Sequence, residues 1–125
     1  MTQSTDTLNG LRDALRAFAA ERDWAQFHTP KNLACALSVE AAELLEPFQW
    51  LASGNKDELG AEAQQAIRYE MADVLTYLIM LADSLDVDLI AATTEKMRLN
   101  ASKYPAAQVR GDARKYSDYK TDTSK

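Results

Sequence analysis

Cysteine is almost absent from the sequence, and the single Cys35 excludes a disulfide framework within the chain. The chain has no charged segment leading into an apolar one at its start, and no apolar run of about 18 residues, so neither secretion nor a membrane span is indicated. These absences favour a soluble protein of the cytoplasm. With 125 residues, the chain has the size expected of one domain.

Positive charge is also in short supply, because 14 Lys and Arg residues face 19 Asp and Glu residues, for a net charge of −5. Proteins that bind nucleic acid polymers through phosphates use clustered cations, so that class of function is not expected. An acidic protein can still bind a phosphate when a divalent cation lies between the two.

The scarcity of breakers, four glycines and three prolines, together with few β-branched residues, predicts an all-α protein. Apolar periodicity, caps and turns predict four helices, at about residues 6–22, 30–50, 57–85 and 88–103. Pro47 should kink or end the second helix near Glu46. Residues 1–105 would form the domain, and residues 106–125, which lack apolar periodicity, an extended or mobile tail.

Two pairs of acids lie in otherwise apolar helical sequence. Glu40 and Glu43, and likewise Glu70 and Asp73, are three residues apart, so each pair projects from one face of its helix. If the two faces meet in a bundle, four carboxylates would repel strongly unless a cation compensates them. Mg²⁺, with Mn²⁺ as a substitute, suits such oxygen ligands, and the chain lacks the E-x-x-H pairs of a di-iron bundle.

An alternative interpretation is that these acids are solvated positions on amphipathic helices, since exposed glutamates are common. A single E-x-x-E motif would favour that alternative. Two matched pairs on successive long helices favour the metal site instead.

Several segments together resemble the all-α nucleoside triphosphate pyrophosphohydrolases of the MazG-like superfamily, most closely the dCTP pyrophosphatase branch. They are "FAAERDWAQFHTPKNL", "EAAELLEPFQW", "EMADVLTYL", "EKMRLNASKYP" and "RKYS". The resemblance implies a four-helix bundle-like fold, Mg²⁺ bound by Glu40, Glu43, Glu70 and Asp73, and attack by a metal-activated water on the α-phosphorus of a (d)NTP. The products would be the nucleoside monophosphate and pyrophosphate, and Glu43 or Glu40 could orient or deprotonate the water.

The same resemblance assigns substrate contacts. The segment holding Trp24, Gln26 and His28 would form the nucleobase pocket together with Trp50, and Tyr77 would lie near the sugar and metals. Lys96 and Asn100, four residues apart, make a polar stripe that could reach the phosphates, as could Lys31. The alternatives are that the aromatic side chains are core or interface anchors and that the polar stripe is a solvated face.

One departure from the branch concerns its nucleotide-contacting histidine, whose position is occupied here by the apolar Leu15. Broad (d)NTP specificity is therefore an alternative to dCTP or modified dCTP. A non-catalytic helical module that binds metal or a basic partner is a second alternative, of a different class.

Long apolar stripes, "VLTYLIML" above all, exceed what one small bundle can cover. Together with the resemblance they predict a homo-oligomer, namely a tetramer built as a dimer of dimers. Trp24 would then reach the nucleotide pocket of a neighbouring subunit.

Overall fold

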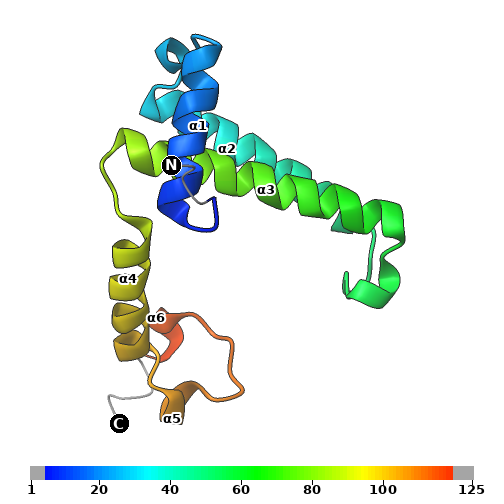
Figure 1. The fold of residues 1–125 in the computed structure, drawn as a ribbon. Coiled ribbons are helices and arrows are strands. Elements are labelled where there is room, and N and C mark those ends of the chain that lie inside the picture. The colour runs from blue at the N-terminus through cyan, green and yellow to red at the C-terminus, as the bar shows by residue number, and fades with distance from the viewer. Residues whose placement is uncertain (1–4, 120–125) are drawn as a thin grey trace. The chain divides into compact units, whose positions relative to one another are not determined.

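The computed structural model describes residues 5–119, and this part of the chain is helical and contains no strand, which confirms the all-α prediction (Figure 1). The elements are α1 Leu8–Glu21, η1 Ala25–Phe27, α2 Pro30–Leu45, η2 Glu46–Phe48, η3 Lys56–Glu58, α3 Ala61–Ser84, α4 Leu89–Lys103, α5 Ala106–Val109 and α6 Tyr116–Tyr119. The chain divides into two compact units, one ending at Val87 and the other beginning at Asp88. Each unit is described by itself.

α1 begins where the side-chain oxygen of Thr7 accepts a hydrogen bond of 3.0 Å from the backbone N–H of Gly10. This cap satisfies one of the free amides in the first turn. The helix ends at Glu21, and Asp23 follows with a φ of 53°, a left-handed conformation that cannot continue a helix.

α2 begins as predicted, with Thr29 accepting from the N–H of Asn32 at 3.2 Å and Pro30 in the first helical position. It ends at Leu45, and residues Glu46–Phe48 form the 3₁₀ turn η2. Pro47 has no N–H to offer to the helical ladder, so the predicted break near Glu46 is confirmed.

α3 starts at Ala61, four residues later than the predicted Asp57, and ends at Ser84. The delay arises because Lys56–Glu58 form the separate 3₁₀ turn η3, whose Glu58 carboxylate is hydrogen-bonded to the preceding loop. The chain leaves the helix through Asp86, which has a φ of 55°.

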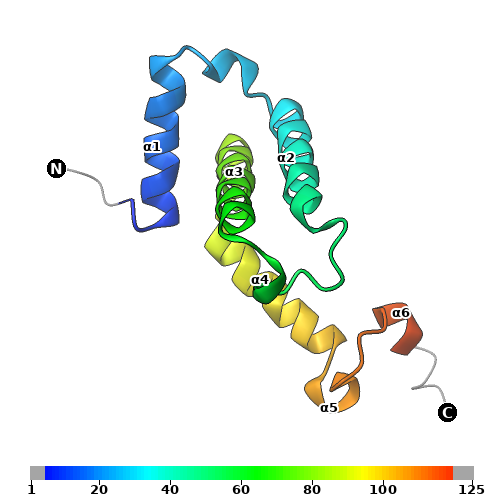
Figure 2. The ribbon, with the colours of Figure 1, turned by 90° about the vertical axis from the view of Figure 1, so that its right-hand side faces the viewer.

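The core of the first unit lies where α2 runs alongside α3 and α1 packs against α3 (Figure 2). Leu33, with 2% of its surface exposed, is the most buried apolar residue described there. The other buried apolar residues are Ala19, Ile67, Ile79 and Ala82. All are small or aliphatic, which suits close approach of the helices.

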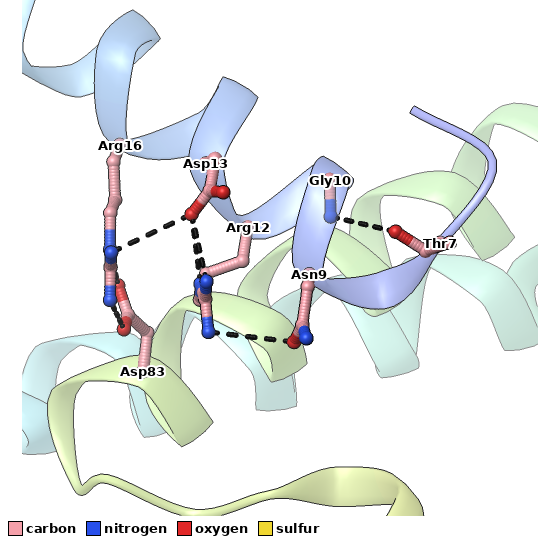
Figure 3. A network of polar contacts seen from close by, with 7 residues as sticks. All are labelled: Thr7, Asn9, Gly10, Arg12, Asp13, Arg16 and Asp83. Carbon is pink, nitrogen blue, oxygen red and sulfur yellow. Dashed lines mark hydrogen bonds and ion pairs between the residues drawn. The ribbon is translucent and has the colours of Figure 1, made fainter. Parts of the chain in front are cut away.

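An ion pair joins α1 to the end of α3 (Figure 3). Arg16 donates two parallel hydrogen bonds to the Asp83 carboxylate, from Nε at 2.7 Å and from Nη2 at 2.5 Å. The guanidinium of Arg16 holds the pKa of Asp83 below its ordinary value. Because Arg16 is more than half exposed, solvent weakens this pair.

In the second unit, Asp88 caps α4 by accepting from the N–H of Ala91 at 3.0 Å, as the sequence predicts. Two four-residue helices, α5 and α6, follow within the segment predicted to be a tail. The last part of that predicted tail, residues 120–125, lies outside the described residues. The boundary at residue 105 stays a prediction.

Candidate metal and nucleotide site

Three carboxylates from two helices meet on the first unit. Glu40 and Glu43 extend from α2 and Glu70 from α3, and one oxygen of each lies within 4.8 Å of the others. The three-residue spacing places the first two on one face of α2. The side-by-side packing of α2 and α3 brings Glu70 to that face.

Asp73, the fourth predicted ligand, is exposed on α3 and lies outside the group of three. Its charge nevertheless acts on Glu40, because it is one of the causes that raise the pKa of Glu40. The structure therefore brings three of the four predicted acids together and leaves the fourth within electrostatic range.

Glu40 has a strongly perturbed proton affinity, since its pKa is raised to about 7. Burial is the largest cause. A proton on Glu40 would also let it donate a hydrogen bond to Glu70 or Glu43, and the charges of Glu43 and Asp73 act in the same direction. The site thus resists holding all of its negative charge without a compensating cation.

Two oxygen atoms of the cluster are buried and unsatisfied. Within the part of the chain that the structure describes, Oε2 of Glu40 and Oε2 of Glu70 have no hydrogen-bond partner. Buried carboxylate oxygens are normally hydrogen-bonded, paired or bound to a metal. The donor set contains only oxygen, so these residues fit a hard divalent cation such as Mg²⁺.

The aromatic residues predicted to hold the base lie at the two ends of α2. Trp24 stands before its start, edge-on to Phe18 with ring centroids 5.8 Å apart. Trp50 follows its end and has 89% of its surface exposed. Tyr77 lies on α3, half-buried, four residues after Asp73.

The other predicted substrate contacts differ in their surroundings. Gln26 uses its amide nitrogen to bond Asp23, at 3.0 Å to the carbonyl and 3.1 Å to the carboxylate. Lys31 is exposed in the first turn of α2. Lys96 and Asn100 are exposed on α4, in the second unit, and their part in the site stays a prediction.

A cavity of about 280 Å³ opens in the first unit, and His28 and Leu15 both line it. Its remaining lining residues are Arg12, Arg16, Ala19, Ala25, Leu33, Ile79, Met80, Asp83 and Ser84. No motif points to Arg16 or Asp83, and 67 positions separate them, so neither residue could be predicted from the sequence to line a cavity. Only the packing of α1 on α3 makes them neighbours.

Helical proteins build oxygen-ligand metal sites where two packed helices turn carboxylates toward one another, and the described residues have this arrangement. Residues 35–119 match the model of the MazG-like family, and the chain belongs to that family. None of the helices described is long and apolar enough to cross a membrane.

Curated relatives and a solved structure agree with this assignment. The chain is 44% identical over 114 residues to human dCTP pyrophosphatase 1, covering 90% of this chain and 67% of that protein. It is 45% identical over 117 residues to the rat protein of the same name, with the same coverage of both chains. The crystal structure of a pyrophosphatase from Archaeoglobus fulgidus superposes with a TM-score of 0.71 at 39% identity, over 84% of this chain and 98% of that one.

Proposed function

We propose that the chain is a Mg²⁺-dependent enzyme that hydrolyses dCTP, or a modified dCTP, to the nucleoside monophosphate and pyrophosphate. The enzyme class follows from the family and from 44% identity to a dCTP pyrophosphatase: the chain is a nucleotide pyrophosphohydrolase. A non-catalytic helical module does not fit these relatives. The metal, the substrate base and the roles of individual residues form the proposal.

The acid cluster carries this proposal. Three carboxylates within 4.8 Å of one another, two of them with a buried oxygen that lacks a partner, need a cation to be stable together in the ionised form. Nucleoside triphosphates bring further negative charge, so a cation between protein and phosphate serves both sides.

Glu40, Glu43, Glu70 and Asp73 would hold Mg²⁺, with Mn²⁺ as a substitute. When bound, the cation neutralises the triphosphate, polarises its phosphoryl oxygens and lowers the pKa of a bound water. Glu43 or Glu40 would orient the attacking water or accept its proton. Hydrolysis then breaks the bond between the α-phosphorus and the oxygen that leaves with pyrophosphate.

The remaining predicted residues would hold the rest of the nucleotide. Trp24 and Trp50 offer ring faces on which a base can stack, which stabilises binding by about 1–3 kcal/mol per base. Gln26 and His28 would complete the base pocket, and Tyr77 would contact the sugar. The residues that would contact the phosphates are Lys31, Lys96 and Asn100.

Broad specificity toward (d)NTPs is a second candidate, and Leu15 is the observation that favours it. Leu15 lines the 280 Å³ cavity and has no polar atom with which to read a base edge. A site built on stacking and apolar contact discriminates between bases weakly, because every base has a π-face.

The experiment is a turnover panel with the purified chain. We expect dCTP and 5-substituted dCTP, incubated with MgCl₂, to yield monophosphate and pyrophosphate, and EDTA to stop the reaction. Equal rates for all standard (d)NTPs would favour the broad-specificity candidate. Failure to form either product with Mg²⁺ or Mn²⁺ would refute the proposed function.

A further inference from the structure

The loop that follows Trp50 is closed by the side chain of Glu58. Its carboxylate accepts hydrogen bonds from the backbone N–H of Ala52 at 3.1 Å, Ser53 at 2.9 Å and Gly54 at 3.2 Å, and also from the Ser53 hydroxyl. Three of these bonds converge on one oxygen, Oε1. Only a group without donors of its own can accept them all, and an ionised carboxylate is such a group.

The electrostatics of Glu58 agree with its role as an acceptor. The bonds from the Ser53 side chain and backbone, followed by those from Ala52 and Gly54, hold the pKa of Glu58 below its ordinary value. The carboxylate is exposed to solvent as well, and both factors keep it ionised at neutral pH. We name residues 51–58, with these bonds, the Glu58 loop.

A second contact ties the Glu58 loop to η2. Gly54 has a φ of 72°, and a Cβ placed there would lie 2.7 Å from Cδ1 of Phe48. Only glycine combines this backbone conformation with so close an approach to the ring. The Phe48 ring, two residues before Trp50, therefore packs directly against the loop.

Trp50 lies between these two anchor points. Its side chain is 89% exposed, so few neighbouring side chains support the ring. Its backbone neighbours, in contrast, are hydrogen-bonded on both sides. Before it, Gln49 N–H donates to the Glu46 carbonyl at 3.4 Å, and after it Leu51 N–H donates to the Phe48 carbonyl at 3.0 Å and Ala52 N–H donates to Glu58. The position of the Trp50 ring in the free protein thus depends on the backbone that the Glu58 loop holds.

We propose that Glu58 is a positioning residue for Trp50, which it holds in place for stacking on the base of the nucleotide. This inference rests on the proposed function, because that function supplies the nucleotide base on which Trp50 would stack. Ordering a side chain and its loop in advance removes part of the conformational entropy that binding would otherwise lose. Glu58 is not one of the carboxylates of the acid cluster.

The first test is the kinetics of Glu58→Gln on dCTP. In the variant, the glutamine NH₂ group would replace one accepting oxygen with a donor that faces the loop N–H groups. The loop would lose hydrogen bonds and should become less ordered. We expect KM to rise about three- to tenfold while kcat stays within about twofold, because substrate positioning changes and the reacting groups do not. Gly54→Ala should change KM in the same direction through the Phe48 contact, and Glu62→Gln, on the first turn of α3, is the matched control with unchanged KM.

The second test asks whether the effect passes through Trp50. In a Trp50→Leu background, Glu58→Gln should cause no further rise in KM, since the residue that it positions is gone. In a Trp24→Phe background, where Trp50 is the sole tryptophan, Glu58→Gln should lower the fluorescence anisotropy of Trp50. If Glu58 had only a structural role, Glu58→Gln would lower the melting temperature but would change neither KM nor the fluorescence anisotropy of Trp50.

The outcomes separate this inference from the proposed function. If the wild-type chain hydrolyses dCTP but Glu58→Gln keeps the wild-type KM, or raises KM equally with and without Trp50, the positioning role is refuted alone. If the wild-type chain hydrolyses no nucleotide, the proposed function fails. The anisotropy measurement then still decides whether Glu58 orders Trp50.

Discussion

At the scale of single residues, the acid cluster places three carboxylates close together and buries part of their polar surface. Glu40 and Glu70 each bury an oxygen without a partner, and the pKa of Glu40 rises to about 7. Such an arrangement destabilises the fold unless a bound ligand compensates the charge. Strongly shifted pKa values of this kind are typical of functional sites. Substitutions there should therefore separate stability from activity.

Loss of one acid should abolish turnover without unfolding the chain. Glu43→Gln and Asp73→Asn remove a charge and keep the side-chain shape, so we expect kcat to fall by about a hundredfold or more while the far-UV CD spectrum stays helical. Glu62→Gln, an acid outside the cluster, should retain wild-type activity. Full activity in either cluster variant would contradict the assignment of that acid.

Glu40→Gln should make the metal-free protein more stable at neutral pH. With its pKa raised to about 7, Glu40 binds more protons in the folded than in the unfolded state, so the free energy of unfolding falls as pH rises from about 4.5 to 7. Glutamine does not ionise and avoids that loss. Urea denaturation in EDTA should show the gain, and added Mg²⁺ should then raise the melting temperature of the variant less than that of wild type.

The Arg16–Asp83 pair should have the opposite pH dependence. The lowered pKa of Asp83 means that its contribution is present above the ordinary value near 3.8 and is lost as pH falls through the folded-state value. Asp83→Asn should cost about 0.2–1 kcal/mol at pH 7, because the pair is partly exposed, and this cost should shrink as the pH falls below 3.8. A constant difference across this range, measured by denaturation at each pH, would show that the charge is not the cause.

At the scale of elements, local signals place the helix ends. The side chains of Thr7, Thr29 and Asp88 each accept a hydrogen bond from the backbone N–H three positions further along the chain, which caps the helix that follows. Pro47 ends α2. The start of α3 is different, because the sequence predicts it at about Asp57 and the helix begins at Ala61. There the Glu58 carboxylate bonds to loop amides instead, a contact that helix propensity does not reveal.

Removal of the α2 cap should destabilise the protein by a measurable amount. Thr29→Ala leaves the N–H of Asn32 without its acceptor, so we expect a loss of about 1 kcal/mol in the free energy of unfolding. Ser38→Ala is the matched control, because the Ser38 hydroxyl only bonds back to the Ala34 carbonyl on an exposed stretch of the same helix. Equal effects of the two substitutions in urea denaturation would refute the role of the cap.

At the scale of the whole molecule, the single chain buries little. In the described residues the core consists of a few small or aliphatic side chains, whereas Val39, Leu45, Tyr69 and Met71 of the first unit are more than half exposed. Apolar surface of this kind on packed helices is typical of an interface. The tetramer predicted from the sequence would cover it, and it stays a prediction.

Light scattering coupled to size exclusion should therefore report about four chains per particle. Met71→Lys, which places a charge on the exposed apolar face, should shift the chain to smaller species and lower the activity, because the base pocket is predicted to borrow Trp24 from a neighbour. Leu85→Lys, at the end of α3, tests whether any exposed apolar position has the same effect. A monomer with full activity would contradict this prediction.

The sequence by itself determined the helical class, most helix ends, the family and the pairing of acids on α2 and α3. The helix ends and the spacing of the acids are local properties, because they depend on helix geometry within one or two turns, whereas the family follows from the resemblance of several motifs together. Only the tertiary structure decided that Glu70 joins Glu40 and Glu43 within 4.8 Å while Asp73 stays outside this group, that Arg16 meets Asp83 across 67 positions, and that Glu58 closes the loop behind Trp50. The first two contacts depend on how α1 and α2 pack against α3, where long-range pairing outweighs the preference of any single segment. The Glu58 bonds join residues only four to six positions apart, but they form only because the chain turns back there, which helix propensity does not reveal.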